Sequence, residues 1–238
     1  MLLERIKQMK TIGLIGGLSW ESSAQYYRII NQRIQEKLGG LHSAKSLMYS
    51  FDFAEIEKLQ HQNLWDEATH LMVEAAQNLE RGGADFIIIC SNTMHKMAGA
   101  VQDQVKIPLL HLADATAEQI VAAKMKKIGL LGTIYTMEQD FYKGRLAEKY
   151  GLEVVVPEAD ERQYVSDVIY QELVLGKVNP ASRQRYREII AHLVEKGVEG
   201  IILGCTEIML LVEQEDSVVP LFDTTTIHAE TAVDYALK

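Results

Sequence analysis

The fold is decided by two stretches that repeat along the chain, GADFIIICSNT (83–93) and GVEGIILGCTE (197–207). Each stretch begins with glycine, continues through an almost wholly apolar run and ends in polar residues. Such apolar runs are typical of strands that are covered on both faces in a parallel sheet. The two stretches therefore predict equivalent buried strands in two similar halves of the molecule.

Two further pairs of segments keep the same order. KTIGLIGG (10–17) is echoed by KKIGLLGT (126–133), and KIPLL (106–110) is echoed by VVPLF (218–222). All three pairs are separated by about 112 to 116 residues, which indicates an internal repeat rather than chance likeness. We expect two α/β halves of doubly wound character, related by a pseudo-twofold axis, with a cleft between them.

Short apolar runs alternate with amphipathic helical stretches. One helix is expected from an N-cap at Ser19 to Gly39-Gly40, and another over 64–81, where Gly82-Gly83 ends it. Strands are expected at 11–16, 46–51, 85–90, 107–111, 127–132, 152–156, 200–205 and 218–222.

Composition excludes several classes of protein. The 238 residues carry a formal net charge of −9, which argues against a nucleic-acid surface. No apolar run reaches the 18 or so residues of a membrane helix, and the first ten residues lack a signal peptide's apolar stretch. Two cysteines make no disulfide framework, so we expect reduced thiols and a cytoplasmic protein.

The repeat brings Ser91 and Cys205 into register, each at the end of its predicted strand. Ligands of open α/β sheets bind beyond the carboxyl ends of the strands. Two facing halves would place these residues on opposite walls of one cleft, as a reaction that inverts a carbon requires. The structural alternative makes Cys205 a buried apolar thiol and Ser91 a helix N-cap.

Four motifs carry a family resemblance: GLIGGLSWES (13–22), CSNTMHK (90–96), GCTEI (204–208) and PLFDT (220–224). With them the chain resembles the cofactor-independent aspartate/glutamate racemases over residues 9–238. The resemblance implies racemisation of acidic amino acids without pyridoxal phosphate, by a residue that removes the α-proton and a partner that reprotonates the opposite face. It also implies a chain that crosses twice between its domains, with 1–106 plus 219–238 as the first domain and 107–218 as the second.

One position departs from the family pattern. The usual motif is Cys-Asn-Thr-x-His, and here Ser91 stands where the family places a catalytic cysteine. Cys90 is one residue earlier, and because adjacent strand residues point to opposite faces, we expect it to face the core. A hydroxyl is a much weaker acid than a thiol, whose pKa is about 8.5. The pattern leaves either an asymmetric Ser/Cys racemase or a protein whose activity is lost or changed.

Substrate carboxylates are expected to meet polar groups at the strand ends and at one helix N-terminus. Without the family resemblance, these groups would be interpreted as turn residues, helix caps and, for Lys177, a solvated side chain. Only the resemblance suggests Lys177 and Gln60 as binding residues. His95, one helical turn after Ser91, and Glu207, beside Cys205, are candidates for tuning proton affinity. The expected binding residues are Leu18, Ser19, Gln60, Asn92, Thr93, Thr133, Lys177 and Thr206.

The sequence thus predicts a racemase of aspartate, glutamate or both, acting as a homodimer on a small amino acid, with no metal and no cofactor. Cys205 would be the thiolate base or thiol acid, its pKa lowered by the N-terminus of a following helix, and Ser91 its hydroxyl partner. The alternatives are a related hydantoin racemase, isomerase or decarboxylase, and a non-catalytic protein that binds small acids.

Overall fold

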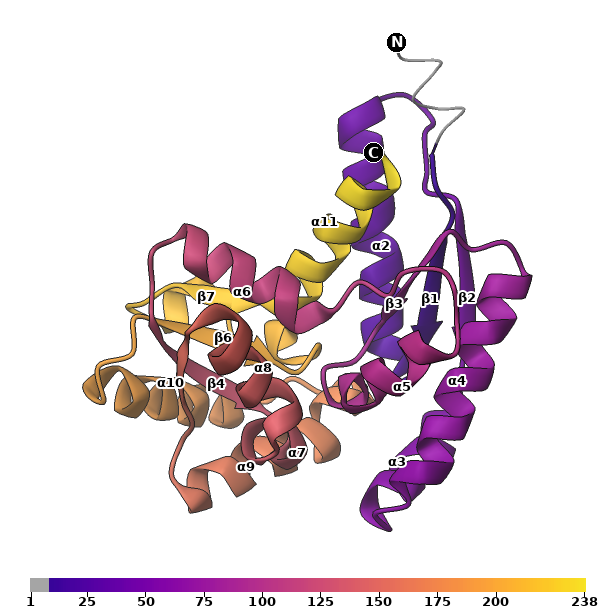
Figure 1. Cartoon of the computed structure of the whole chain (residues 1–238). Coiled ribbons are helices and arrows are strands. Elements are labelled where there is room, and N and C mark those ends of the chain that lie inside the picture. The colour runs from indigo at the N-terminus through magenta and orange to yellow at the C-terminus, as the bar shows by residue number, and fades with distance from the viewer. Residues whose placement is uncertain (1–8) are drawn as a thin grey trace. The chain divides into compact units, whose positions relative to one another are not determined.

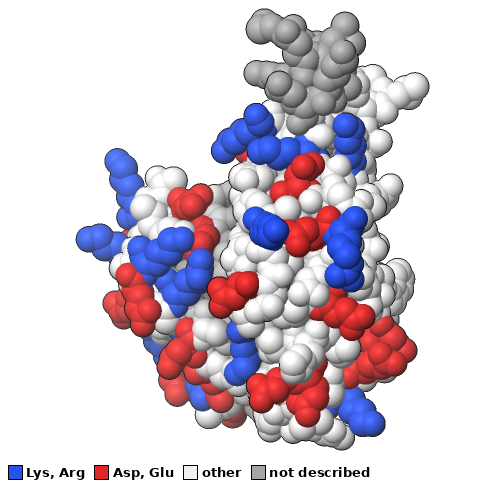
Figure 2. Space-filling model, turned by 45° about the vertical axis from the view of Figure 1, so that its right-hand side comes forward, with Lys and Arg blue, Asp and Glu red and all other residues white. Residues whose placement is uncertain are grey.

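A computed structural model describes residues 9–238, which form two compact units. The first unit runs to His111 and resumes at His228, and the second runs from Leu112 to Ile227. Among the helices of residues 9–238, none combines the length and the apolar character that a membrane-spanning helix requires. On the face drawn in Figure 2, basic and acidic side chains are interspersed.

The first unit is a parallel sheet covered on both faces (Figure 1). Its strands lie in the order β2-β1-β3, with β1 at Ile12–Gly16, β2 at Ser46–Ser50 and β3 at Phe86–Ile89. One face packs against α2 and the end of α11, and the opposite face packs against α4. Its helices are α2 (Trp20–Leu38), α3 (Phe53–His61), α4 (Trp65–Arg81), α5 (Ala98–Asp103) and the last part of α11 (Thr224–Ala236).

The second unit is a four-stranded parallel sheet in the order β5-β4-β6-β7. The strands are β4 (Lys127–Gly132), β5 (Glu153–Val155), β6 (Gly200–Gly204) and β7 (Leu221–Asp223). The helices are α6 (Leu112–Ala122), α7 (Ile134–Glu138), α8 (Asp140–Tyr150), α9 (Ala159–Gln171) and α10 (Pro180–Glu195). A single apolar cluster joins the helices of this unit to both faces of the sheet.

The repeat is visible in the strand pairing. In the first unit β1 lies between β2 and β3, and in the second unit β4 lies between β5 and β6. Leu109 adds a parallel bridge to Ile87 on β3, at the position where Leu221 of β7 pairs with Ile201 on β6. Both units therefore share one strand order, and the predicted α/β class with two parallel sheets is confirmed.

Two of the predicted strands differ in the structure. Residues 107–111 make only a single bridge, because Pro108 has no N–H and takes part solely as an acceptor, from Ile87 N at 2.9 Å. The strand expected at 218–222 begins only at Leu221, after a proline that accepts from Ile201 N in the same way.

The last strand also belongs to a different unit from the one expected. It pairs with β6 through Ile202 and Phe222, so the expectation that it returns to the first half is wrong. Only the C-terminal helix returns, from His228 onward. The units consequently divide after His111 and Ile227, whereas the sequence had placed the boundaries after 106 and 218.

The predicted helix ends agree with the structure where capping residues mark them. Ser19 is the N-cap of α2 and accepts from Ser22 N at 3.5 Å, and Gly39 is its C-cap. Just before this helix, Gly17 has a φ of +71°, and a Cβ there would lie 2.2 Å from the carbonyl oxygen of Phe51. Only glycine fits this turn, so β1 passes directly into α2 through a tight loop.

Candidate active site

The ends of β3 and β6 are equivalent in detail. Cys205 directly follows β6, Ser91 lies two residues past the end of β3, and each is 8% exposed. The residues that follow, Asn92 and Thr206, are almost completely buried. Because the carboxyl ends of parallel strands are where such sheets bind ligands, these residues are the candidate site residues in each unit.

Ser91 lies in a tight turn that leads into a short 3₁₀ helix, Thr93–Met97. Its hydroxyl accepts a hydrogen bond from Met94 N at 3.4 Å, and its carbonyl oxygen accepts from His95 Nδ1 at 2.6 Å. The first bond resembles that of an N-cap side chain, as the structural alternative expected, but the N-cap of this 3₁₀ helix is Asn92. The second fixes the backbone of Ser91, so the position of its hydroxyl is set by the turn.

Cys90 points away from this turn. It is wholly buried and packs with Ile12, Leu14 and Phe86 in the core on the α2 side of the sheet. Burial raises the pKa of its thiol far above the usual range. The prediction that Cys90 faces the core is confirmed, and a buried, fully protonated thiol of this kind is chemically inert.

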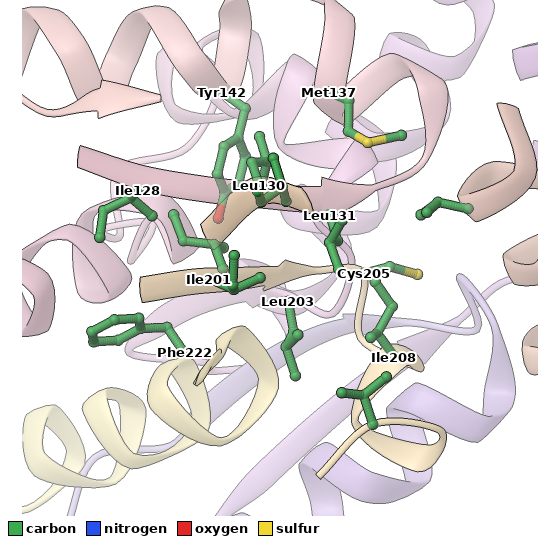
Figure 3. Close-up of a cluster of buried hydrophobic side chains, with 14 of the residues drawn as sticks. Ile128, Leu130, Leu131, Met137, Tyr142, Ile201, Leu203, Cys205, Ile208 and Phe222 are labelled. Atoms are coloured by element: carbon green, nitrogen blue, oxygen red, sulfur yellow. The ribbon is translucent and has the colours of Figure 1, made fainter. Parts of the chain in front are cut away.

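Cys205 lies beyond the apolar side chains of its strand, with its sulfur directed away from Ile201 and Leu203 (Figure 3). The thiol donates to Glu207 Oε2 at 3.0 Å, and Thr206 Oγ1 donates to the same oxygen at 2.8 Å. Glu207 is itself buried, so this carboxylate is held inside the protein by two neighbouring donors.

The environment of Cys205 raises the pKa of its thiol well above the ordinary value. Burial is the main cause, followed by the negative charge of Glu207 and its hydrogen bond, while the amides of Glu207 and Thr206 act in the opposite direction. The expectation of a lowered pKa is therefore wrong. The helix that follows is only the three-residue turn Ile208–Leu210, too short to offset a neighbouring carboxylate.

The turn between β1 and α2 is held by internal hydrogen bonds. The hydroxyl of Ser23 accepts from Gly17 N at 2.8 Å and donates to the carbonyl oxygen of Ser19 at 2.9 Å. Leu18 and Ser19 are both buried. These bonds hold the turn at the N-terminus of a 19-residue helix, where the helix dipole and the amides of the first turn favour an anion.

The other predicted binding residues are divided between the units. Gln60, on α3, donates from Nε2 to Met94 Sδ at 3.1 Å and so contacts the turn that holds Ser91. Thr133 is the N-cap of α7 and accepts from Thr136 N at 3.3 Å. Lys177 is exposed, in the connection before α10. The first unit holds Leu18, Ser19, Gln60, Ser91, Asn92 and Thr93, and the second holds Thr133, Lys177, Cys205 and Thr206.

Sequence reasoning missed two histidines near Ser91. The ring of His95 lies 4.6 Å from the ring of His111 and 5.7 Å from that of His228, measured between centroids. The signal available was the position of His111 directly after the IPLL segment, which the strand order brings beside β3. Within residues 9–238, no group of three His, Cys, Asp or Glu side chains is placed to hold a metal ion.

Two parallel sheets, each with a strand that leads into a buried polar turn, define an α/β protein of the kind that binds ligands beyond the ends of its strands. The chain belongs to the Asp/Glu/hydantoin racemase family, whose sequence model matches residues 15–232. It is accordingly an enzyme of the isomerase class.

Individual relatives agree with this assignment. The broad specificity amino-acid racemase RacX of Bacillus subtilis is 24% identical over 230 residues, which cover 93% of this chain and 96% of that protein. A Yersinia pestis protein proposed to be an Asp/Glu racemase shares 55% identity, with a TM-score of 0.90 over 97% of this chain and 100% of its own. An aspartate racemase homologue from Pyrococcus horikoshii OT3 shares 36% identity, with a TM-score of 0.83 over the same fractions of the two chains.

Proposed function

We propose that this protein racemises aspartate, glutamate or both, with Cys205 and Ser91 exchanging protons at opposite faces of the substrate Cα. The observation that carries the proposal is the equivalence of the two strand ends. Both residues lie just past the end of a buried strand, both are 8% exposed, and each is the first polar group beyond a buried apolar run. Membership of the racemase family supplies the reaction class.

On the β6 side, the thiol of Cys205 donates a hydrogen bond to the carboxylate of Glu207. In the resting protein the proton lies on sulfur, since the pKa of the thiol is raised. Transfer of this proton to Glu207 Oε2, 3.0 Å away, gives a thiolate beside a neutral carboxyl group. The thiolate then removes the α-proton, and the electron pair of the broken C–H bond stays on the substrate as a carbanion-like species.

On the β3 side, the hydroxyl of Ser91 donates a proton to the opposite face of that carbon and takes a replacement from water. Glu207 returns its extra proton to solvent, which restores the starting charge, and the abstracted proton remains on sulfur. A hydroxyl is the weaker acid, so this step depends on fixed donors that lower the energy of the carbanion. The proposed donors to the substrate carboxylates are the amides near Leu18, Asn92 and Thr206.

Gln60, Thr133 and Lys177 complete the proposed set of binding residues. The first contacts the Ser91 turn, the second caps a helix at the end of β4, and the third is an exposed cation. An additional carboxylate on the substrate would give these donors a partner that a neutral amino acid lacks.

The test is exchange of the α-hydrogen with solvent in deuterium oxide, measured for both enantiomers of aspartate and of glutamate. We expect deuterium at the α-position together with loss of optical rotation towards an equal mixture. A panel of neutral amino acids and of hydantoins runs alongside as the control for substrate class. Exchange confined to hydantoins, or binding of the acids without any exchange, would contradict the proposal.

A further inference from the structure

Three histidines from separate segments of the first unit meet beside Ser91. His95 comes from the 3₁₀ turn after β3, His111 follows the bridge at Leu109, and His228 lies in α11. The ring of His95 is the common member, with centroid distances of 4.6 Å to His111 and 5.7 Å to His228. We call these three residues the histidine cluster.

Hydrogen bonds determine which ring nitrogen of two of these histidines carries the hydrogen. The carbonyl oxygen of Ser91 can only accept, so His95 Nδ1, at 2.6 Å, is the donor. His228 Nε2 donates to the carbonyl oxygen of Leu110 at 2.9 Å, and its Nδ1 therefore accepts from the Tyr26 hydroxyl at 3.0 Å. Both rings are buried and oriented by these bonds.

Two members of the cluster stand where the chain changes units. His111 is the last residue before the chain leaves the first unit, and His228 is the first after it returns. The side chains at both crossings thus pack against the His95 ring, which is bonded to the carbonyl oxygen of Ser91. Accurate placement of a catalytic group lowers the barrier of the step in which it acts, so the placement of Ser91 affects its proton transfer.

We propose that His95 is a positioning residue for Ser91 and that His111 and His228 hold its ring in place. His95 acts through the backbone carbonyl of Ser91 and does not exchange a proton with the substrate. This inference rests on the proposed role of Ser91 in proton transfer.

The kinetic test compares His95→Leu with His95→Asn, because asparagine retains a donor close to the position of Nδ1. The enantiomer served by Ser91 is identified first, as the one whose α-deuterium exchange fails in Ser91→Ala. His95→Leu is expected to lower kcat for that exchange by about tenfold or more, as for a misplaced catalytic group, and to change the other enantiomer by less than about twofold. His95→Asn should restore most of the loss, and His70→Leu, at an exposed site on α4, is the matched control.

Equal loss for both enantiomers in His95→Leu, or no loss at all, would overturn the positioning role. If His95→Leu does not fold, His111→Phe and His111→Ala replace it, since only phenylalanine keeps the ring contact. Nitrogen-15 spectra of the wild-type histidines test the geometry without any assay of activity. They should show hydrogen on Nδ1 of His95 and on Nε2 of His228, and the opposite tautomer at His95 would refute the inference even if Ser91 proved to be catalytic.

Discussion

The ends of β3 and β6 have equivalent backbone positions, and they differ in the ionisable group that lies beside the candidate reactive side chain. After β6, Cys205 has the buried carboxylate of Glu207 at 3.0 Å. After β3, the position equivalent to Glu207 is Thr93, and the nearby ionisable group is His95, bonded to the carbonyl oxygen of Ser91. One end provides a proton acceptor for a thiol, and the other provides a fixed backbone for a hydroxyl.

This difference follows from the chemistry of the two side chains. A thiol can be ionised by a neighbouring base, so a carboxylate beside it is useful even though it raises the resting pKa. A serine hydroxyl is not ionised by either group, and only its placement and the stability of the carbanion can assist it. In the mechanism proposed above, the two halves of one repeat would assist proton transfer by different means.

Cys205→Ala is expected to have the largest effect. It removes the only side chain that can serve as a thiolate at the β6 end, and we expect racemisation to fall by about a thousandfold or more. Initial rates with both enantiomers measure the effect, and circular dichroism checks that the fold is intact. Residual activity above a few per cent of wild type would show that the thiol is not the essential base.

The substitution Ser91→Ala tests the role of the β3 end separately from that of the β6 end. It should abolish net inversion while Cys205 continues to exchange solvent deuterium into one enantiomer, because that thiol can return a proton to the side it came from. Ser91→Cys should instead speed the step at position 91 by about tenfold or more, since a thiol is the stronger acid. Equal loss of exchange from both enantiomers in Ser91→Ala would refute the two-sided mechanism.

Glu207→Gln keeps the shape of the acceptor and removes its charge. Without the carboxylate the pKa of Cys205 should fall, because the charge and hydrogen bond of Glu207 both raise it. We expect kcat to decrease by about a hundredfold, as for loss of a general base, and the ionisation of the thiol to move to lower pH. Ultraviolet thiolate absorbance in a Cys90→Ala background measures this shift, and Glu207→Asp is the matched control that retains the charge.

Acid sensitivity of folding should originate in the first unit, at His228. Burial lowers the pKa of this histidine from 6.5 to about 4. The unfolded chain binds the proton more readily, so stability is full above pH 6.5 and is lost as the pH falls towards 4, by up to about 3 kcal/mol. Urea unfolding across this range measures the slope, and His228→Gln should flatten it. An unchanged slope in the variant would assign the sensitivity to other groups.

Cys90→Ala is expected to have the smallest effect. The side chain is wholly buried on the core side of β3, so its loss should cost about 1 kcal/mol of stability and leave kcat nearly unchanged. Thermal unfolding and initial rates are the measurements. A loss of activity as deep as that of Cys205→Ala would mean that the cysteine at position 90, and not the serine at 91, serves the β3 end.

Much of the fold could be predicted from the sequence, because apolar runs and capping residues act locally. The strand at 127–132 and the helix from Ser19 to Gly39 agree with the structure. The edge segments at 107–111 and 218–222 were less well predicted, since a proline limits the hydrogen bonds that each can make. Their pairing depends on contacts far along the chain, which periodicity does not reveal.

The sequence by itself determined the repeat, the paired positions 91 and 205, and the inward direction of Cys90, because these follow from spacing and from the alternation of strand residues. Only the tertiary structure decided the protonation state of Cys205 and which side chains surround Ser91. The pKa of the thiol depends on its burial and on the direction of the Glu207 side chain. The histidine cluster joins residues from three distant segments. Charge and ring contacts act through space, and only the folded chain brings those groups together.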